Sequence, residues 1–218
     1  MLLLTLLGCD PDAASGPFAL AFDGGEDCVE AELGPLTPPA AFTVEAWIRG
    51  EPVPADRARP VVAWKGVFTL GEAFGGDTVF TVGDAEAGAT SAVSVMDGVL
   101  HHVAGTWDGE KANLYVDGVR QAFVSTAAPV APTATLRIGC DSDVNTFEGV
   151  IDEVRVSSSV RYTEDGSPPS GPFEEDAETF ALFHLDEGEG TETVDAAQDL
   201  VGAVYGPEWV PFKLTVNE

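Results

Sequence analysis

Positively charged residues are scarce in this chain of 218 residues. Ten Lys and Arg stand against 37 Asp and Glu, which gives a formal net charge of -27. Binding to nucleic acid depends on Lys and Arg side chains that neutralise phosphates and release counterions, so the composition argues against a nucleic acid as partner. Direct binding to an anionic membrane surface is disfavoured for the same reason. Two interpretations of the acidity stay open, a solvated surface and a carboxylate-lined cation site.

Histidine and cysteine are also few, and their arrangement excludes several kinds of site. The three histidines are His101, His102 and His184, and no G-x-S-x-G motif accompanies them, so the sequence offers no catalytic triad. It has no C-x-x-C motif or Cys/His cluster and therefore no indication of a zinc site. His101 and His102 are adjacent on an expected strand and point to opposite faces, so we expect one to face the core and be hydrogen-bonded.

The apolar stretch at residues 1–7 is too short to cross a bilayer as a helix, which needs about 20 residues. It looks like the end of a secretion signal, and the L-L-G-C sequence at residues 6–9 resembles the bacterial lipobox. That resemblance implies cleavage before Cys9 and lipidation of its thiol, although no Lys or Arg precedes the stretch.

This front end predicts the organisation of the whole chain. We expect a lipoprotein signal peptide over residues 1–8, a tether over residues 9–17 and a single domain over residues 18–218. The mature protein would then be exported and held in a membrane by its lipid, in the periplasm or at the cell surface. The alternative is an apolar first strand that ends in Gly-Cys.

From residue 18 onward, short apolar or alternating runs are separated by clusters of Gly, Asp and Pro, without sustained helical periodicity. This pattern predicts strands over residues 18–22, 28–33, 42–49, 61–70, 78–82, 91–95, 100–107, 112–116, 120–124, 134–139, 147–156, 179–185 and 208–216. So many consecutive strands predict an all-β fold, a two-sheet antiparallel sandwich.

Two Asp-Gly pairs indicate hairpins within this series. Asp108-Gly109 and Asp117-Gly118 supply the positive φ angles that a two-residue type I′ turn requires, so residues 100–124 should form a three-stranded meander. In its middle strand Tyr115 points away from the apolar side, toward water or a ligand. The longest irregular stretch, residues 161–178, is expected to wrap across the outside of the sandwich.

Cys28 and Cys140 remain once Cys9 is set aside as a lipid acceptor. Both lie on expected strands or strand ends far apart in the sequence. In an oxidising compartment they could form a disulfide that constrains the unfolded chain. Two buried free thiols are the alternative.

Successive motifs along the chain resemble the signature strands of laminin G-like, concanavalin A-like jelly rolls found in bacterial surface proteins. The resemblance extends from about residue 18 to the end, and it is carried by A-L-A-F-D-G-G-E-D-C-V-E-A (19–31), F-T-V-E-A-W-I-R (42–49), H-H-V-A-G-T-W-D-G-E-K-A-N-L-Y-V-D-G (101–118), L-R-I-G (136–139) and F-E-G-V-I-D-E-V-R-V (147–156). It implies a two-sheet antiparallel jelly roll that serves as a binding module for carbohydrate or protein, sometimes with a structural calcium.

Two departures from the family pattern concern the cysteines. The family usually has Tyr at the position of Cys28 and Gly at the position of Cys140. Because both substitutions occur in this one pair, the resemblance favours a disulfide between neighbouring strands.

Some relatives of this fold are glycoside hydrolases, in which two carboxylates face each other on a concave surface. The sequence has one E-x-D-x-E, formed by Glu174, Asp176 and Glu178. In the enzymes the motif alternates with apolar residues on a strand, whereas here Glu175 interrupts it and a Pro-rich loop precedes it. We therefore interpret the motif as a solvated acidic turn and the protein as no enzyme.

Calcium prefers several oxygen ligands. Asp141, Asp143 and Asn145 offer oxygens at alternate positions of one loop. Asp23 and Asp152 are similar to positions that hold structural calcium in related sandwiches. The alternative is that Asp23 caps a turn and Asp152 is simply hydrogen-bonded.

Aromatic faces that could stack on sugar rings are the remaining candidates. Trp47 and Trp107 lie within apolar strand patterns and should be buried. Trp64, beside Lys65, and Tyr115 are the candidates for a ligand surface. The sequence thus predicts an exported, lipid-anchored module that binds a glycan or a protein at the cell envelope. The alternatives are a structural envelope lipoprotein without a discrete ligand, and a glycoside hydrolase of the same fold.

Overall fold

The structure is a computed structural model that describes residues 17–34, 37–83 and 88–214. The predicted signal peptide, the lipidation of Cys9 and all but the last residue of the predicted tether lie outside the described residues. Within the described ranges, no helix has the length and apolar character needed to cross a membrane.

The described residues form sixteen β-strands and no helix. In chain order the strands are β1 Phe18–Asp23, β2 Cys28–Glu32, β3 Phe42–Gly50, β4 Arg59–Trp64, β5 Phe68–Glu72, β6 Thr78–Val82, β7 Ala89–Ser91, β8 His101–Trp107, β9 Lys111–Val116, β10 Val119–Ser125, β11 Thr135–Ile138, β12 Glu148–Ser157, β13 Thr179–Phe183, β14 Glu192–Val194, β15 Val201–Tyr205 and β16 Glu208–Pro211.

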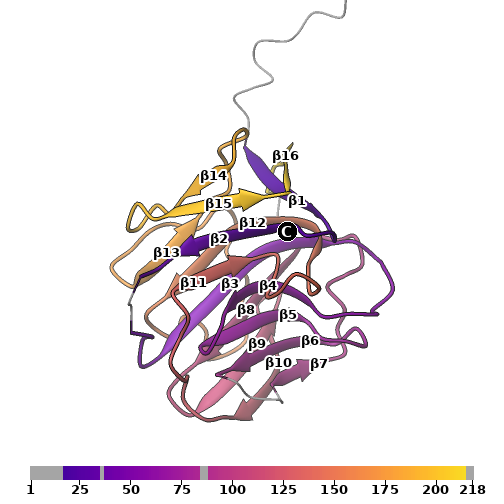
Figure 1. Cartoon of the computed structure of the whole chain (residues 1–218). Helices are drawn as coiled ribbons and strands as arrows, with labels where there is room; N and C mark the ends of the chain where they lie inside the picture. Colours follow the sequence, from indigo (N-terminus) through magenta and orange to yellow (C-terminus); the bar gives the residue numbers. More distant parts are fainter. Residues whose placement is uncertain (1–16, 35–36, 84–87, 215–218) are drawn as a thin grey trace, which may run out of the picture.

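These strands form two antiparallel sheets that lie face to face (Figure 1). Sheet A has the order β10-β9-β8-β3-β12-β1-β16, and β13 also pairs with β12. Sheet B has the order β14-β15-β2-β11-β4-β5-β6-β7. The chain crosses repeatedly between the sheets, as in a jelly roll, so the predicted sandwich is confirmed.

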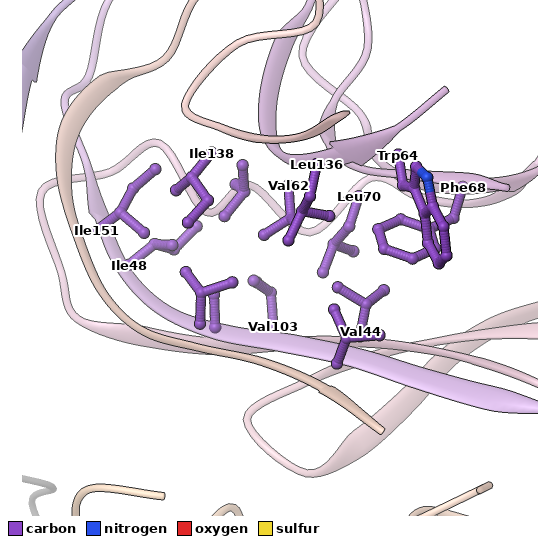
Figure 2. Close-up of a cluster of buried hydrophobic side chains, with 14 of the residues drawn as sticks. Val44, Ile48, Val62, Trp64, Phe68, Leu70, Val103, Leu136, Ile138 and Ile151 are labelled. Atoms are coloured by element: carbon purple, nitrogen blue, oxygen red, sulfur yellow. The ribbon is translucent and has the colours of Figure 1, made fainter. Parts of the chain in front are cut away.

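The core fills the space between the two sheets. Alternate residues of each strand point inward, and their aliphatic side chains meet there (Figure 2): Val44, Ile48, Val103 and Ile151 from sheet A, and Val62, Leu70, Leu136 and Ile138 from sheet B. Each of these side chains contributes about 1.5–3 kcal/mol when fully buried. Trp47 and Trp107 are buried as predicted.

The strand predicted over residues 61–70 is wrong, because the chain reverses in its middle. Gly66 has a φ of 87°, and the amide of Val67 donates to the carbonyl of Trp64 at 2.8 Å. A positive φ is costly for most residues but not for glycine. The run of apolar residues is therefore two short neighbouring strands, β4 and β5.

Other differences concern strand ends and turns. Residues 92–95 are not in a strand, and β14 and β15 were not predicted. Asp117 and Gly118 have φ angles of 51° and 77°, which fits the predicted type I′ turn. At the other hairpin Gly109 has a positive φ of 101° but Asp108 does not, so the prediction of a type I′ turn there is wrong.

Candidate functional site

The outer face of sheet A is covered by residues 158–178, the covering segment, which joins β12 to β13. The amide of Arg161 donates to Thr43 Oγ1 at 2.9 Å, and the hydroxyl of Tyr115 donates to the carbonyl of Tyr162 at 3.0 Å. The prediction that this irregular stretch wraps across the outside of the sandwich is confirmed.

Glu45 lies at the centre of a buried polar cluster beneath the covering segment. Its carboxylate accepts hydrogen bonds from Arg155 Nε at 2.9 Å and from the Tyr162 hydroxyl at 2.6 Å, and it contacts His102 Nε2 at 3.0 Å. Burial opposes the ionisation of Glu45, but the hydrogen bond and charge of His102 and the charge of Arg155 outweigh it, so the pKa of Glu45 is lowered. Burial and the carboxylate of Glu45 raise the pKa of Tyr162.

This cluster is occupied by the protein's own side chains. Both carboxylate oxygens of Glu45 are engaged, so the cluster fixes the covering segment to the sheet instead of presenting a group to a ligand. His102 is the buried, hydrogen-bonded histidine that the sequence predicted, but it lies on the outer face of sheet A and not between the sheets.

The prediction that Tyr115 lies at a ligand surface is wrong. Its side chain points away from the core, as the alternation indicated, yet Tyr115 is only 1% exposed. The ring of Tyr162 lies over it at 5.6 Å between centroids. The covering segment, which follows Tyr115 by more than forty residues, occupies the space that was expected to be open.

The same prediction for Trp64 is also wrong. Trp64 points into the core, is 1% exposed and stacks on Phe180 at 5.7 Å between ring centroids. Its indole N–H donates to the carbonyl of Thr133 at 2.9 Å, which satisfies the buried donor. Lys65, the polar neighbour that suggested a surface, belongs to the turn that begins directly after Trp64.

The outer face of sheet B, in contrast, carries small and polar side chains. Successive strand partners in one row across six strands are Ala203, Glu30, Arg137, Ala63, Thr69 and Thr81. Four of these six are Ala or Thr, so the row leaves space above the sheet.

Two hollows lie over this face, and both are lined by Arg137 and Ser142. The first hollow, of about 360 Å³, lies beside β15 and β2, and its other lining residues include Glu26, Cys28, Glu30, Cys140, Asp143 and Tyr205. The second hollow, of about 530 Å³, lies beside β4 and β5, and its other lining residues include Lys65, Thr69, Thr133, Thr135, Asp141 and Asn145. Hydroxyl, amide and charged groups therefore converge on one open face, as in sites for polar ligands.

Arg137 is held in place between the two hollows. Its Nη2 pairs with Glu30 Oε1 at 2.8 Å, and its Nη1 donates to the carbonyl of Asp141 at 2.8 Å. A guanidinium has five N–H donors, so further donors remain for a ligand. Because Arg137 is anchored on both sides, little side-chain entropy is lost when a ligand binds.

Tyr205 is the aromatic residue that the sequence interpretation missed. It is 55% exposed at the end of β15 and lines the first hollow. The signal was present in the alternation of V-G-A-V-Y, because Gly202 and Val204 are buried and Tyr205 must then face outward. The segment was not recognised as a strand, so this alternation was not used.

A disulfide joins Cys28 to Cys140, with a Cα–Cα distance of 5.4 Å. Cys28 begins β2, and Cys140 follows the neighbouring strand β11, so the bridge ties two adjacent strands as the resemblance implied. Both cysteines line the first hollow. The bridge therefore fixes the base of the loop that carries Ser142 and Asp143.

The predicted calcium ligands fall into three places. Asp141, Asp143 and Asn145 lie in one loop beside the hollows. Asp23 and Asp152 do not share a site, because Asp23 pairs with Glu148, four residues before Asp152. Among the described residues, no three Asp, Glu, His or Cys side chains gather in a metal-binding arrangement. Calcium binding stays a prediction for the loop.

Asp23 and Asp152 make the contacts that the alternative to calcium binding predicted, a turn cap for Asp23 and a hydrogen bond for Asp152. Asp23 Oδ1 accepts from the amide of Gly25 at 2.7 Å and thereby caps the turn after β1. Asp152 accepts from the amide of Glu153 at 3.1 Å. Burial, followed by the charge of Glu153, raises the pKa of Asp152 to about 8.

The E-x-D-x-E motif lies within the covering segment and is exposed. The carboxylate of Asp176 binds the guanidinium of Arg161 through two hydrogen bonds, of 2.9 and 2.7 Å. Glu174 and Glu178 are exposed. The interpretation as a solvated acidic turn is confirmed.

Comparison with known proteins identifies the family. The family described as the Concanavalin A-like lectin/glucanases superfamily matches residues 23–165. The chain belongs to this superfamily. No curated protein matches the sequence.

Solved structures share the concanavalin A-like fold at low sequence identity. A candidate carbohydrate-binding protein from Bacteroides ovatus has a TM-score of 0.69 and 18% identity, over 93% of this chain and 62% of that chain. Domain 4 of an extracellular arabinanase from Geobacillus stearothermophilus, solved in complex with arabinotriose, has a TM-score of 0.52 and 16% identity, over 69% of this chain and 72% of that chain. Mouse laminin alpha1 domains LG4-5 have a TM-score of 0.51 and 18% identity, over 73% of this chain and 47% of that chain.

Proposed function

We propose that this concanavalin A-like domain is a non-catalytic module that binds a glycan on the outer face of sheet B. The observation that carries the proposal is the difference between the two outer faces. Sheet A is covered by the chain itself, while sheet B presents two adjoining hollows lined by hydroxyl, amide and guanidinium groups.

The chemistry of this face suits a sugar. A sugar hydroxyl both donates and accepts hydrogen bonds, and Thr69 and Asn145 offer both capacities in the second hollow. Tyr205 adds an exposed aromatic face in the first hollow, on which a sugar ring can stack. The arabinanase domain with bound arabinotriose supports a glycan ligand for a sandwich of this kind.

We further propose that the protein is exported and anchored at the cell envelope through a lipid on Cys9. The lipobox-like residues 6–9 and the Cys28–Cys140 disulfide support this location, because structural disulfides persist in oxidising compartments. Labelling of the expressed chain with a radioactive fatty acid tests the anchor. Wild type should incorporate the label and Cys9→Ser should not, and equal labelling of both would contradict it.

A glycan array probed with the full chain carrying Cys9→Ser tests the binding function. We expect binding to neutral polysaccharides, and a loss of about tenfold or more in affinity for Tyr205→Ala. Phe123→Ala is the matched control, because Phe123 is an aromatic residue 64% exposed on β10 of the other sheet. Absence of binding to every glycan on the array by a folded sample would overturn the proposal. Equal losses of affinity in Tyr205→Ala and Phe123→Ala would also overturn it. Binding to a protein by the same face would replace the glycan with a protein ligand.

A further inference from the structure

The two hollows on sheet B adjoin each other. Both include Arg137 and Ser142, and they lie on opposite sides of β11. Because sheet B has the order β15-β2-β11-β4-β5 here, a line from the first hollow to the second crosses the strands. A ligand that reaches from Tyr205 to Thr69 must therefore pass over Arg137.

The hollows are too large together for a single small ligand. Volumes of about 360 and 530 Å³ each fall within the range of pockets that hold a drug-sized molecule. A monosaccharide would fill part of one hollow and leave the other hollow empty. A chain of linked sugars would contact Tyr205, Arg137 and the threonines at once.

The charge of the site selects among such chains. Glu26, Glu30 and Asp143 line the first hollow, and Arg137, the one cation among its described lining residues, is already paired with Glu30. An anionic sugar in this hollow would meet carboxylates at close range, and the chain as a whole carries a formal charge of -27. Neutral sugars are not repelled by the carboxylates of the hollow or by the net negative charge of the chain, and their hydroxyls can donate hydrogen bonds to the carboxylates.

Building on the proposed function, we infer that the ligand is a segment of a neutral polysaccharide that fills both hollows at once and crosses β11 over Arg137. Tyr205 stacks on a ring at one end of this segment. Lys65, Thr69 and Asn145 bind hydroxyls at the other end. Four strand spacings of about 4.8 Å separate β15 from β5, so the segment contains more than two sugar units and a disaccharide reaches only one hollow.

Isothermal titration calorimetry on the full chain with Cys9→Ser tests this inference. The probes are neutral arabino-, xylo-, cello- and chito-oligosaccharides of two to six units, with oligogalacturonates of the same lengths as the anionic series. For the neutral series that binds, we expect affinity to rise by at least about tenfold from two units to the length that fills both hollows, and then to level off. Oligogalacturonates should bind more weakly at every length.

Variants of the two hollows locate the ligand. Tyr205→Ala and Lys65→Met should each weaken the binding of an oligosaccharide of six units. Only one of the two variants should weaken the binding of a disaccharide, because a disaccharide occupies one hollow. Phe123→Ala and Lys111→Met, both on sheet A, are the matched controls and should leave affinity unchanged.

Equal affinity for two and six units would overturn the inference and leave the proposed glycan binding intact. Tighter binding of oligogalacturonates than of neutral oligosaccharides would overturn the inference that the ligand is neutral, and it would also leave the proposed glycan binding intact. Absence of binding to every series would overturn both the inference and the proposed function.

Discussion

The guanidinium of Arg155 and the carboxylate of Glu45 meet at 2.8 Å between sheet A and the covering segment. Glu45 is 0% exposed, so each charge depends on the other for its neutralisation. This pair joins β3 to β12 on the outer face of sheet A. The surrounding hydrogen bonds from Tyr162 and His102 make the pair part of one network.

Removal of one partner should therefore destabilise the protein strongly. We expect Glu45→Gln to lower the free energy of unfolding by about 3–5 kcal/mol, because it leaves Arg155 as an uncompensated buried charge. Urea denaturation measures the loss. Asp176→Asn is the control, since it weakens the ion pair of Arg161 with a carboxylate that is 48% exposed, and it should cost about 1 kcal/mol. Similar losses in the two variants would show that the cluster is not sealed from water.

The disulfide should contribute to stability through the unfolded state. Cys28 and Cys140 are separated by 112 residues, and a bridge over such a long loop typically contributes about 2–5 kcal/mol. The double variant with both cysteines changed to alanine should lose this amount in urea denaturation. A reductant should lower the melting temperature of the wild type and leave the double variant unchanged. An equal effect of reductant on both proteins would contradict the bridge.

Asp152 should make stability fall as the pH rises. Its pKa is raised to about 8 by burial and by the charge of Glu153, whereas an unfolded Asp titrates near 3.9. Between these values the unfolded state is ionised and the folded state is not, so ionisation favours unfolding. The slope is at most about 1.4 kcal/mol per pH unit.

Asp152→Asn should remove that slope, because the amide oxygen can still accept the bond from Glu153. We expect the variant to be more stable than wild type at pH 8 and closer to it at pH 5, measured by urea denaturation. Glu164→Gln, an exposed position, is the control and should leave the pH profile unchanged. A wild-type profile that is flat across this interval would show that Asp152 is ionised in the folded state.

Calcium should bind only weakly, if the loop at residues 141–145 is its site. Two carboxylates and one amide on a partly exposed loop resemble low-affinity extracellular sites with dissociation constants of about 0.1–1 mM. A chelator should therefore leave the melting temperature unchanged, and calcium in excess of this range should raise it. Asp143→Asn should abolish the rise. A chelator-sensitive melting temperature would point to a tighter site.

The strand positions were predictable where local rules suffice. Period-two alternation places Val44 and Ile48 inside, and the Asp117-Gly118 pair defines its own turn because both residues adopt positive φ. The segment of residues 61–70 was assigned to one strand, although Lys65 and Gly66 interrupt its apolar run at the reversal. β15 was missed because Gly202 and Ala203, which have low strand preference, interrupt its Val and Tyr residues.

The candidate site was less predictable than the fold. Alternation assigned Tyr115 to the outer face correctly, but a strand sequence does not say what covers that face. Tyr115 is buried because the covering segment lies over it. Trp64 points into the core, and the polar residue Lys65 that suggested a surface belongs to the turn that follows it. Arg137 on β11 and Tyr205 on β15 come together at the first hollow because both strands pair with β2, which lies far from each of them in the sequence.

The sequence by itself determined that this chain folds as an acidic two-sheet sandwich, because periodicity, turn residues and motif order are local properties. Tertiary structure alone decided which outer face is covered and which is open. That choice depends on contacts between segments distant in sequence, such as Tyr162 on Glu45, and no local pattern encodes them.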